Sequence, residues 1–333
     1  MKALVYTGPN SLAFRDEPNP VPLNDEVVVK VDAVGICGSD MHAYHGFDSR
    51  RPAPLILGHE AAGVAMSGRH KGRRVTVNPL VTCGACDFCL DGRSHLCGSR
   101  QIISMMPRPG AFAEFVRIPE QNLVEVPEGL DIVKAALAEP IAVSYHAVQL
   151  GLKASPRPAS SLTATVLGGG AIGLGAALVL AMSGCRQIHV AEPNRARRET
   201  VRKSGPFAPY EPGTANDPKD GSIDLVLDAV GADKTREAAC RLVKPGGVIV
   251  HIGLLPGSGG VDVRKLTLQE VTFVGTYCYT MVEFRETVAA LASGQLSTLD
   301  WVEQRPLSDG AAAFKAIDEG RTAAAKIILR PAS

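Results

Sequence analysis

Four cysteines in the sequence have the spacing of a metal site: Cys83, Cys86, Cys89 and Cys97. Four thiolates this close together can complete a tetrahedral shell around zinc, with Zn–S distances of about 2.3 Å. A closed shell leaves no position for a substrate, so we expect a structural zinc. The alternatives are an iron–sulfur cluster, whose commoner cysteine spacings differ, and disulfides, which the lack of a recognisable signal peptide disfavours.

A glycine-rich run predicts a dinucleotide site. The pattern G-x-G-x-x-G stands at residues 168–173, after the apolar stretch 163–167 and at the start of a predicted helix over 171–183, as the motif requires. The glycines permit a tight turn, close approach of a pyrophosphate and close packing of helix on strand. The helix N-terminus offers N–H groups and a partial positive charge to the phosphates. The residues predicted to bind the cofactor here are Gly168, Gly170, Ala171, Ile172 and Gly173.

Charged residues after the next predicted strand bear on the choice of cofactor. Glu192 follows Gly173 at about the distance at which such folds place a carboxylate on the adenosine ribose. A carboxylate there repels a 2′-phosphate, which favours NAD over NADP, whereas Arg197 weakens that preference; a helix cap is the alternative role for Glu192. Asp228 and Gly253 end later strands and are expected to line the cofactor crevice, with turn chemistry as the alternative for Asp228.

Three further segments carry sulfur, nitrogen and oxygen donors: Cys37-Gly38-Ser39-Asp40, Gly58-His59-Glu60 and Ala138-Glu139-Pro140. Taken singly, a cysteine is usually a small buried hydrophobe, and a histidine is usually a satisfied polar residue. Catalytic zinc, however, typically has three protein ligands and an open fourth position. Cys37, His59 and Glu139 together form a mixed donor set that suits such a site.

In these motifs, and in their order along nearly the whole chain, the sequence resembles the zinc-containing medium-chain dehydrogenases. Within that family it is similar to the sorbitol, idonate and galactitol-type polyol dehydrogenases, because Glu139 stands where simple alcohol dehydrogenases commonly carry cysteine. Residues 35–36 and 110–115 also match. The resemblance implies a GroES-like β-rich catalytic domain, completed by C-terminal residues, and an inserted Rossmann domain.

The resemblance also implies roles for single residues. The implied ligands of the catalytic zinc are Cys37, His59, Glu60 and Glu139. Glu60 would be either a direct ligand or a close partner that exchanges with water. Ser39 would start a proton relay through the cofactor ribose to His42 and solvent, with a plain surface histidine as the alternative for His42. Zinc would act as a Lewis acid on the substrate hydroxyl, and NAD would accept the hydride.

The expected activity is oxidation of a secondary hydroxyl of a polyol, sugar alcohol or sugar acid to a ketone, with two zinc ions per chain and NAD. The alternatives are a threonine- or glucose-type zinc dehydrogenase and a nucleotide-binding protein of the same fold without catalysis. Thr276 precedes Tyr277 where sorbitol dehydrogenases carry a substrate-binding arginine, so the particular substrate stays open. Because family members are dimers or tetramers, we expect a homodimer or homotetramer.

Two kinds of segment must position these residues. The first part of the chain is rich in short strands and turns, as in the alternating run 26–34. A helix is predicted over 130–147, with a break at Pro140. The stretch 154–161 contains two prolines, Pro156 and Pro158, and is interpreted as a junction between domains. Strands and helices then alternate, which predicts a parallel sheet with helices on both faces, although 205–221 is too irregular for a full strand and helix.

The fold class predicted is therefore α/β. We expect a GroES-like domain of residues 1–150, to which 276–333 return, and a Rossmann domain of residues 151–275. A length of 333 residues suits about two domains. The net charge of +1 gives no reason to expect nucleic acid or a membrane surface as a partner. The expected partner is a small-molecule alcohol, and the expected location is the cytoplasm.

Overall fold

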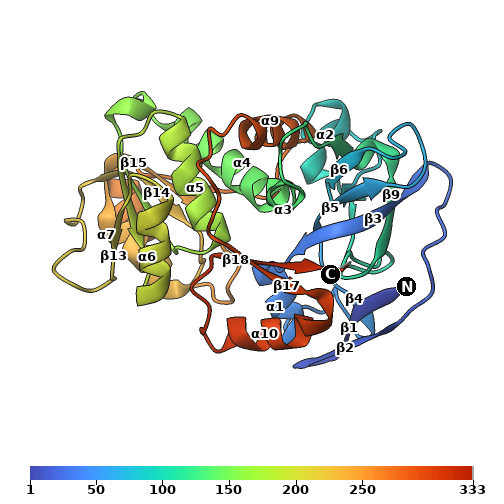
Figure 1. The fold of residues 1–333 in the computed structure, drawn as a ribbon. Helices are drawn as coiled ribbons and strands as arrows, with labels where there is room; N and C mark the ends of the chain where they lie inside the picture. Colours follow the sequence, from blue (N-terminus) through green and yellow to red (C-terminus); the bar gives the residue numbers. More distant parts are fainter. Residues whose placement is uncertain (332–333) are drawn as a thin grey trace.

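A six-stranded parallel sheet forms one lobe of the computed structural model, which describes residues 1–331 (Figure 1). In spatial order its strands are β13 (Ala208–Tyr210), β12 (Gln187–Ala191), β11 (Thr163–Leu167), β14 (Ile223–Asp228), β15 (Val243–His251) and β16 (Thr272–Gly275). The chain order reverses between β11 and β14, so their carboxyl ends flank the switch point at which doubly wound sheets bind dinucleotides. The irregular segment 205–221 contains only the short strand β13 and no helix.

Helices cover both faces of this sheet because successive side chains of a strand point to opposite sides. Leu225 and Leu227 of β14 belong to the core shared with α4 (Ala138–Ala154) and α5 (Ala171–Met182). Val226 belongs to a separate core with α7 (Asp233–Leu242) and α8 (Val263–Leu268). Every residue of β14 is buried, as expected for a central parallel strand.

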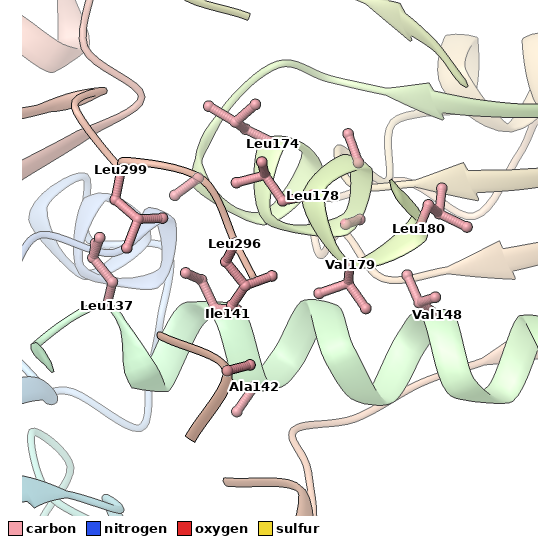
Figure 2. Packing of buried hydrophobic residues seen from close by; sticks show 14 of the residues in the cluster. Leu137, Ile141, Ala142, Val148, Leu174, Leu178, Val179, Leu180, Leu296 and Leu299 are labelled. Atoms are coloured by element: carbon pink, nitrogen blue, oxygen red, sulfur yellow. The ribbon is translucent and has the colours of Figure 1, made fainter. Parts of the chain in front are cut away.

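Close packing of α4 against α5 joins the two lobes. Figure 2 shows Ile141 and Val148 of α4 facing Leu178 and Val179 of α5. A methyl group added at Gly175 would lie 2.7 Å from Ser144 Oγ, so this approach requires glycine. Each fully buried aliphatic side chain in such a contact contributes about 1.5–3 kcal/mol relative to exposure. This packing fixes the start of α4, and with it Glu139, relative to the cofactor-binding helix α5.

The second lobe is built mainly from antiparallel strands, with β17 and β18 as the one parallel pair among its described residues. Its larger sheet contains, in order, β10 (Leu123–Glu125), β6 (Arg74–Val77), β5 (Glu60–Ala65), β3 (Glu26–Gly35), β18 (Lys326–Arg330) and β17 (Val302–Pro306), and β9 (Phe115–Pro119) also pairs with β3. A smaller sheet contains β2 (Ser11–Asp16), β1 (Lys2–Gly8) and β4 (Leu55–Ile56). Because β18 pairs with the end of β3, the C-terminal segment returns to the N-terminal lobe, as Figure 1 shows in red and blue.

The predicted helix break at Pro140 is wrong. The interruption lies earlier, between α3 (Ile132–Ala135) and α4, and α4 continues through Pro140 to Ala154. Pro140 is in the first turn of α4, where a backbone N–H has no intrahelical acceptor, so the proline costs little. Two further helices lie in the C-terminal segment, α9 (Met281–Ala292) and α10 (Gly310–Asp318). Within residues 1–331 no helix combines the length and apolar character needed to cross a bilayer.

Candidate active site and metal centres

Three predicted donors converge where β3, β4 and β5 meet. Cys37 caps α1 (Gly38–Tyr44) two residues after the end of β3, His59 immediately precedes β5, and Glu60 is the first residue of β5. One ligand atom from each of these three residues lies within 4.8 Å of the other two. A thiolate, an imidazole and a carboxylate at such separations are the donor types that zinc takes in mixed sites.

Buried groups hold His59 in one orientation. Its Nδ1 lies 3.6 Å from Asp40 Oδ1 and 3.4 Å from Ser104 Oγ, which leaves Nε2 for a ligand bond. Asp40 is itself fixed, because its carboxylate accepts the backbone N–H groups of Cys37 and Gly58. Burial opposes the charged imidazole, but Asp40 and Cys37 outweigh burial and hold the pKa of His59 well above its usual value. The ring is thus oriented and polarised before any metal binds.

Glu60 is paired with a lysine that the sequence analysis did not single out. Lys326 Nζ of β18 donates to Glu60 Oε1 at 2.6 Å and to the Ile36 carbonyl at 2.8 Å. Both side chains are almost fully buried. Glu60 Oε2 is buried and has no hydrogen-bond partner within residues 1–331. An orphaned carboxylate oxygen beside Cys37 and His59 is the strongest sign that this cluster fits a cation.

Glu139 lies in the same cavity but outside this tight group. It is in the first turn of α4 and 6% exposed, and Tyr279 donates its hydroxyl to Glu139 Oε1 at 2.9 Å. Burial raises the pKa of Glu139 to about 7, with Glu60 adding to the rise and His59 opposing it. A buried carboxyl pushed toward its neutral form is stabilised as the anion when a cation binds beside it. Glu139 can therefore bind a cation in this cavity, although its carboxylate does not lie among the three clustered donors.

The four-cysteine lobe has the geometry of a closed zinc shell. Its sulfur atoms all lie within 4.8 Å of one another, with Sγ–Sγ distances of 3.5 Å for Cys86–Cys89, 3.5 Å for Cys83–Cys97 and 3.9 Å for Cys83–Cys89. Tetrahedral Zn–S bonds of about 2.3 Å require sulfurs roughly 3.8 Å apart. The short helix α2 (Asp87–Leu90) within the lobe has no buried residue. The lobe thus has little core of its own, as expected where a metal orders the chain.

A histidine pair connects this lobe to the helix that carries Glu139. His95 of the lobe lies edge-on to His146 of α4, with ring centroids 4.9 Å apart. His146 Nδ1 is 2.8 Å from Glu283 Oε1, at the start of α9. Burial lowers the pKa of His95 to about 4, so its ring is neutral and packs as an aromatic group. Order in the cysteine lobe is therefore linked to the position of α4.

The glycine turn at 168–173 has the backbone geometry that the dinucleotide motif requires. Gly168 has a φ of 102°, a conformation that other residues rarely adopt. A methyl group on Gly173 would lie 1.8 Å from the Gly168 carbonyl, so only glycine allows this packing. Gly170 caps α5, and a methyl group added to it would meet no other atom within 4 Å. The turn at Gly168 and the close packing at Gly173 match the motif, and the open space at Gly170 leaves room for a pyrophosphate.

Glu192 follows β12 and lies at the rim of the turn. Its carboxylate accepts the N–H groups of Gly169 at 3.0 Å and Asn194 at 2.8 Å, so part of its role is structural. Arg197 Nη1 lies 3.7 Å from Glu192, and Arg197 Nε is buried without a partner in the described residues. Both side chains line the cavity, which keeps them available to an adenosine ribose.

Asp228 and Gly253 differ in position. Gly253 lines the cavity together with Ala229 and Val230. Asp228 is fully buried behind that wall, where it accepts the N–H groups of Val230 and Gly231 and the Thr235 hydroxyl. These contacts stabilise the turn after β14, which is the alternative role considered for Asp228. Asp228 shapes the cofactor wall from behind.

One cavity of about 930 Å³ unites these parts. It is lined by the predicted residues Cys37, Ser39, His42, His59, Glu139, Gly168, Gly170, Ala171, Ile172, Gly173, Glu192, Arg197 and Gly253. Of the predicted residues outside the cysteine lobe, only Glu60 and Asp228 are absent from the lining, because each is buried behind it. A donor cluster and a phosphate-binding turn therefore open into the same space, the arrangement that hydride transfer between an alcohol and a nicotinamide requires.

Comparisons with known proteins agree with this geometry. The alcohol dehydrogenase GroES-like domain matches residues 23–128, and the zinc-binding dehydrogenase domain matches residues 171–293. The chain is 30% identical to L-galactonate-5-dehydrogenase of Escherichia coli (strain K12), over 89% of each chain. It is 31% identical to 2-dehydro-3-deoxy-L-galactonate 5-dehydrogenase of Pseudoalteromonas atlantica, over 96% of this chain and 95% of the relative.

A solved structure of a dehydrogenase has a similar fold. A short chain alcohol dehydrogenase of Escherichia coli CFT073, complexed with NADH, superposes with a TM-score of 0.88 at 25% identity over 99% of both chains. Fold and site together define a zinc-dependent dehydrogenase that uses a nicotinamide dinucleotide. The chain belongs to the zinc-containing medium-chain dehydrogenases, so the predicted family and the predicted α/β fold class are confirmed.

Proposed function

We propose that this enzyme transfers a hydride from a secondary alcohol of a polyol, sugar alcohol or sugar acid to NAD, giving a ketone. The observation that carries the proposal is the shared cavity, in which Cys37, His59 and Glu139 face the cofactor turn at 168–173. Two of the curated relatives, both named as 5-dehydrogenases of galactonate or a galactonate derivative, support the substrate class. Glu192 at the rim supports NAD over NADP.

Cys37, His59 and Glu139 would hold the catalytic zinc, with Glu60 exchanging as a further donor. Zinc in that position supplies a Lewis acid that polarises the alcohol oxygen. Ser39 and His42 are three residues apart on α1 and therefore share a face of the helix, and both line the cavity.

We assign Ser39 Oγ as the first acceptor of the hydroxyl proton and His42 as the group that passes it to solvent. Arg51 Nη2 lies 3.4 Å from Ser39 Oγ and orients that hydroxyl. Burial lowers the pKa of His42, so its ring is neutral near pH 7 and able to accept a proton.

The test of the proposed function is a screen for reduced cofactor. Zinc-loaded enzyme is incubated with NAD or NADP and with polyols, sugar acids, sugar phosphates, threonine or aldoses, and absorbance at the nicotinamide band is followed. We expect activity with NAD on polyols or sugar acids. Activity confined to threonine or to aldoses would show that polyols and sugar acids are not the substrates. Activity on no alcohol would favour a nucleotide-binding protein without catalysis.

Metal analysis of freshly purified enzyme is expected to find two zinc ions per chain. The Cys97→Ser variant should lose the structural zinc and melt at a lower temperature, because Cys97 is buried and the lobe has little core. Elemental analysis with a thermal melt checks both outcomes. A wild-type enzyme with zinc in the cysteine lobe alone would argue against the catalytic site.

We further propose a cytoplasmic homodimer or homotetramer with two domains. The proposed domains are residues 1–150 with 276–333, of which 332–333 lie outside the described residues, and residues 151–275. Strand β16 supports an oligomer, because it is the edge of its sheet and leaves Phe273 36% exposed. All eight cysteines are free thiols, which suits a reducing compartment. Light scattering that gives a monomer mass, or cell fractionation that places the protein outside the cytoplasm, would contradict these proposals.

A further inference from the structure

The loop after α1 forms a charged wall of the cavity that the proposed mechanism leaves largely unused. Phe47, Asp48, Arg50 and Arg51 of this loop all line the cavity that contains the zinc donors. The side chains of Asp48 and Arg51 are 8% and 2% exposed, whereas that of Arg50 is 61% exposed. Arg50 is therefore the charged group of this wall that a ligand can reach.

Arg51 belongs to the frame of the loop. Its guanidinium donates to the carbonyls of Ser39 and Ser104 at 3.3 and 3.0 Å and to Asp48 Oδ2 at 2.7 Å. These bonds tie the loop to α1 and leave Arg51 buried. Its positive charge remains in the wall, while its hydrogen bonds are made within the protein.

Arg50 is held by one edge of its guanidinium. Its Nε donates to Asp48 Oδ1 at 2.8 Å and its Nη2 to Asp48 Oδ2 at 3.0 Å, a fork-to-fork pair that sets the plane of the group. Arg50 Nη1 has no hydrogen-bond partner within residues 1–331. The second edge, Nη1 with Nη2, is thus left free on a side chain that lines the cavity, and a planar carboxylate matches such an edge in two-point contact.

The charge balance of this wall also favours an anion. Asp48 is shared by Arg50 and Arg51, so these three residues carry one net positive charge. Tyr277 also lines the cavity, and Arg100 adds a second cation behind it, since its guanidinium lies 4.6 Å from the Tyr277 ring centroid and its Nε donates to the phenol oxygen at 3.2 Å. The loop and Arg100 thus contribute net positive charge at and behind this part of the cavity lining.

We propose that Arg50 binds the carboxylate of the substrate, and that the physiological substrates are sugar acids rather than uncharged polyols. This inference rests on the proposed function and narrows its substrate class. The free guanidinium edge and the positive charge beside it suit an anionic carboxylate held in two-point contact. Arg50 thereby determines specificity, while the zinc donors and the cofactor turn carry out the reaction on either kind of substrate.

The test compares matched pairs of substrates, each a sugar acid and its reduced polyol, on wild type, Arg50→Gln, Arg50→Lys and Arg93→Gln. Arg93 is the matched control, because it also pairs with an aspartate two residues earlier, Asp91, but on the exposed surface of the cysteine lobe away from the cavity. In the wild type we expect a higher kcat/KM on the acid. In Arg50→Gln the KM for the acid should rise about ten- to a hundredfold, as expected for loss of a charge-assisted pair.

The same variant should keep its kcat/KM on the polyol within about twofold, and Arg50→Lys should retain part of the preference, because it keeps the charge without the fork. Arg93→Gln should change neither KM nor kcat/KM on either substrate. Wild-type activity on polyols alone, a preference for sugar phosphates, or an equal loss on acid and polyol in Arg50→Gln would overturn the role of Arg50 and leave the proposed function standing. Activity on neither acids nor polyols would overturn the proposed function itself.

Discussion

Replacing Glu139 by alanine is expected to abolish measurable turnover while the affinity for NADH stays within about twofold of the wild type. The loss should exceed the roughly 10–100-fold that changes around metal ligands cost, because Glu139 is proposed as a ligand. The cofactor should still bind, since its turn at 168–173 lies on a different element, at the start of α5. Initial rates and NADH fluorescence titration measure the two quantities separately.

A graded variant separates the role of Glu139 from general damage to the site. Tyr279→Phe removes only the hydroxyl that donates to Glu139 Oε1, so it should lower kcat by about 10–100-fold. Each substitution leaves one buried polar group without its hydrogen-bond partner, so both variants should melt below the wild type by a similar, modest amount. Turnover retained in Glu139→Ala would remove this residue from the mechanism.

Lys326→Met is expected to lower the free energy of unfolding by about 3–5 kcal/mol. The substitution leaves the Glu60 carboxylate, which is fully buried, without its counter-charge. Burial alone lowers the pKa of Lys326, but Glu60 outweighs it and holds that pKa above its usual value, so the lysine is charged in the folded protein. Urea denaturation of the metal-loaded enzyme gives the change in stability.

A surface pair in the same lobe provides the control. Lys315 Nζ lies 3.9 Å from Glu319 Oε1 on α10, and the lysine is 68% exposed, so Lys315→Met should change stability by no more than about 1 kcal/mol. The double variant Lys326→Met with Glu60→Gln should recover part of the loss, because it removes the orphaned charge. Equal, small losses for Lys326→Met and Lys315→Met would show that the buried pair does not stabilise the fold.

Much of the candidate site was predictable because its residues lie in short motifs of the sequence. The cysteine lobe lies within one short segment, and the glycine turn joins one strand to the next helix, so spacing alone indicated both. The partners of the donors were not predictable in this way. Lys326 is far from Glu60 in sequence and Tyr279 is far from Glu139, and nothing local pairs them. For Lys326 a signal did exist, since it is a lone charge in the apolar run 323–329.

The sequence by itself determined which chemistry this chain can perform, because residue types and short spacings decide which metal and which cofactor can be held. It also determined the alternation of strand and helix after residue 163, since the hydrophobic period follows from local geometry. Only the tertiary structure decided which donor oxygens are free. The pairing of β18 with β3 brings Lys326 to Glu60, and the packing of α4 on α5 brings Glu139 beside His59. Contacts of this kind depend on how separate elements dock, which local sequence does not encode.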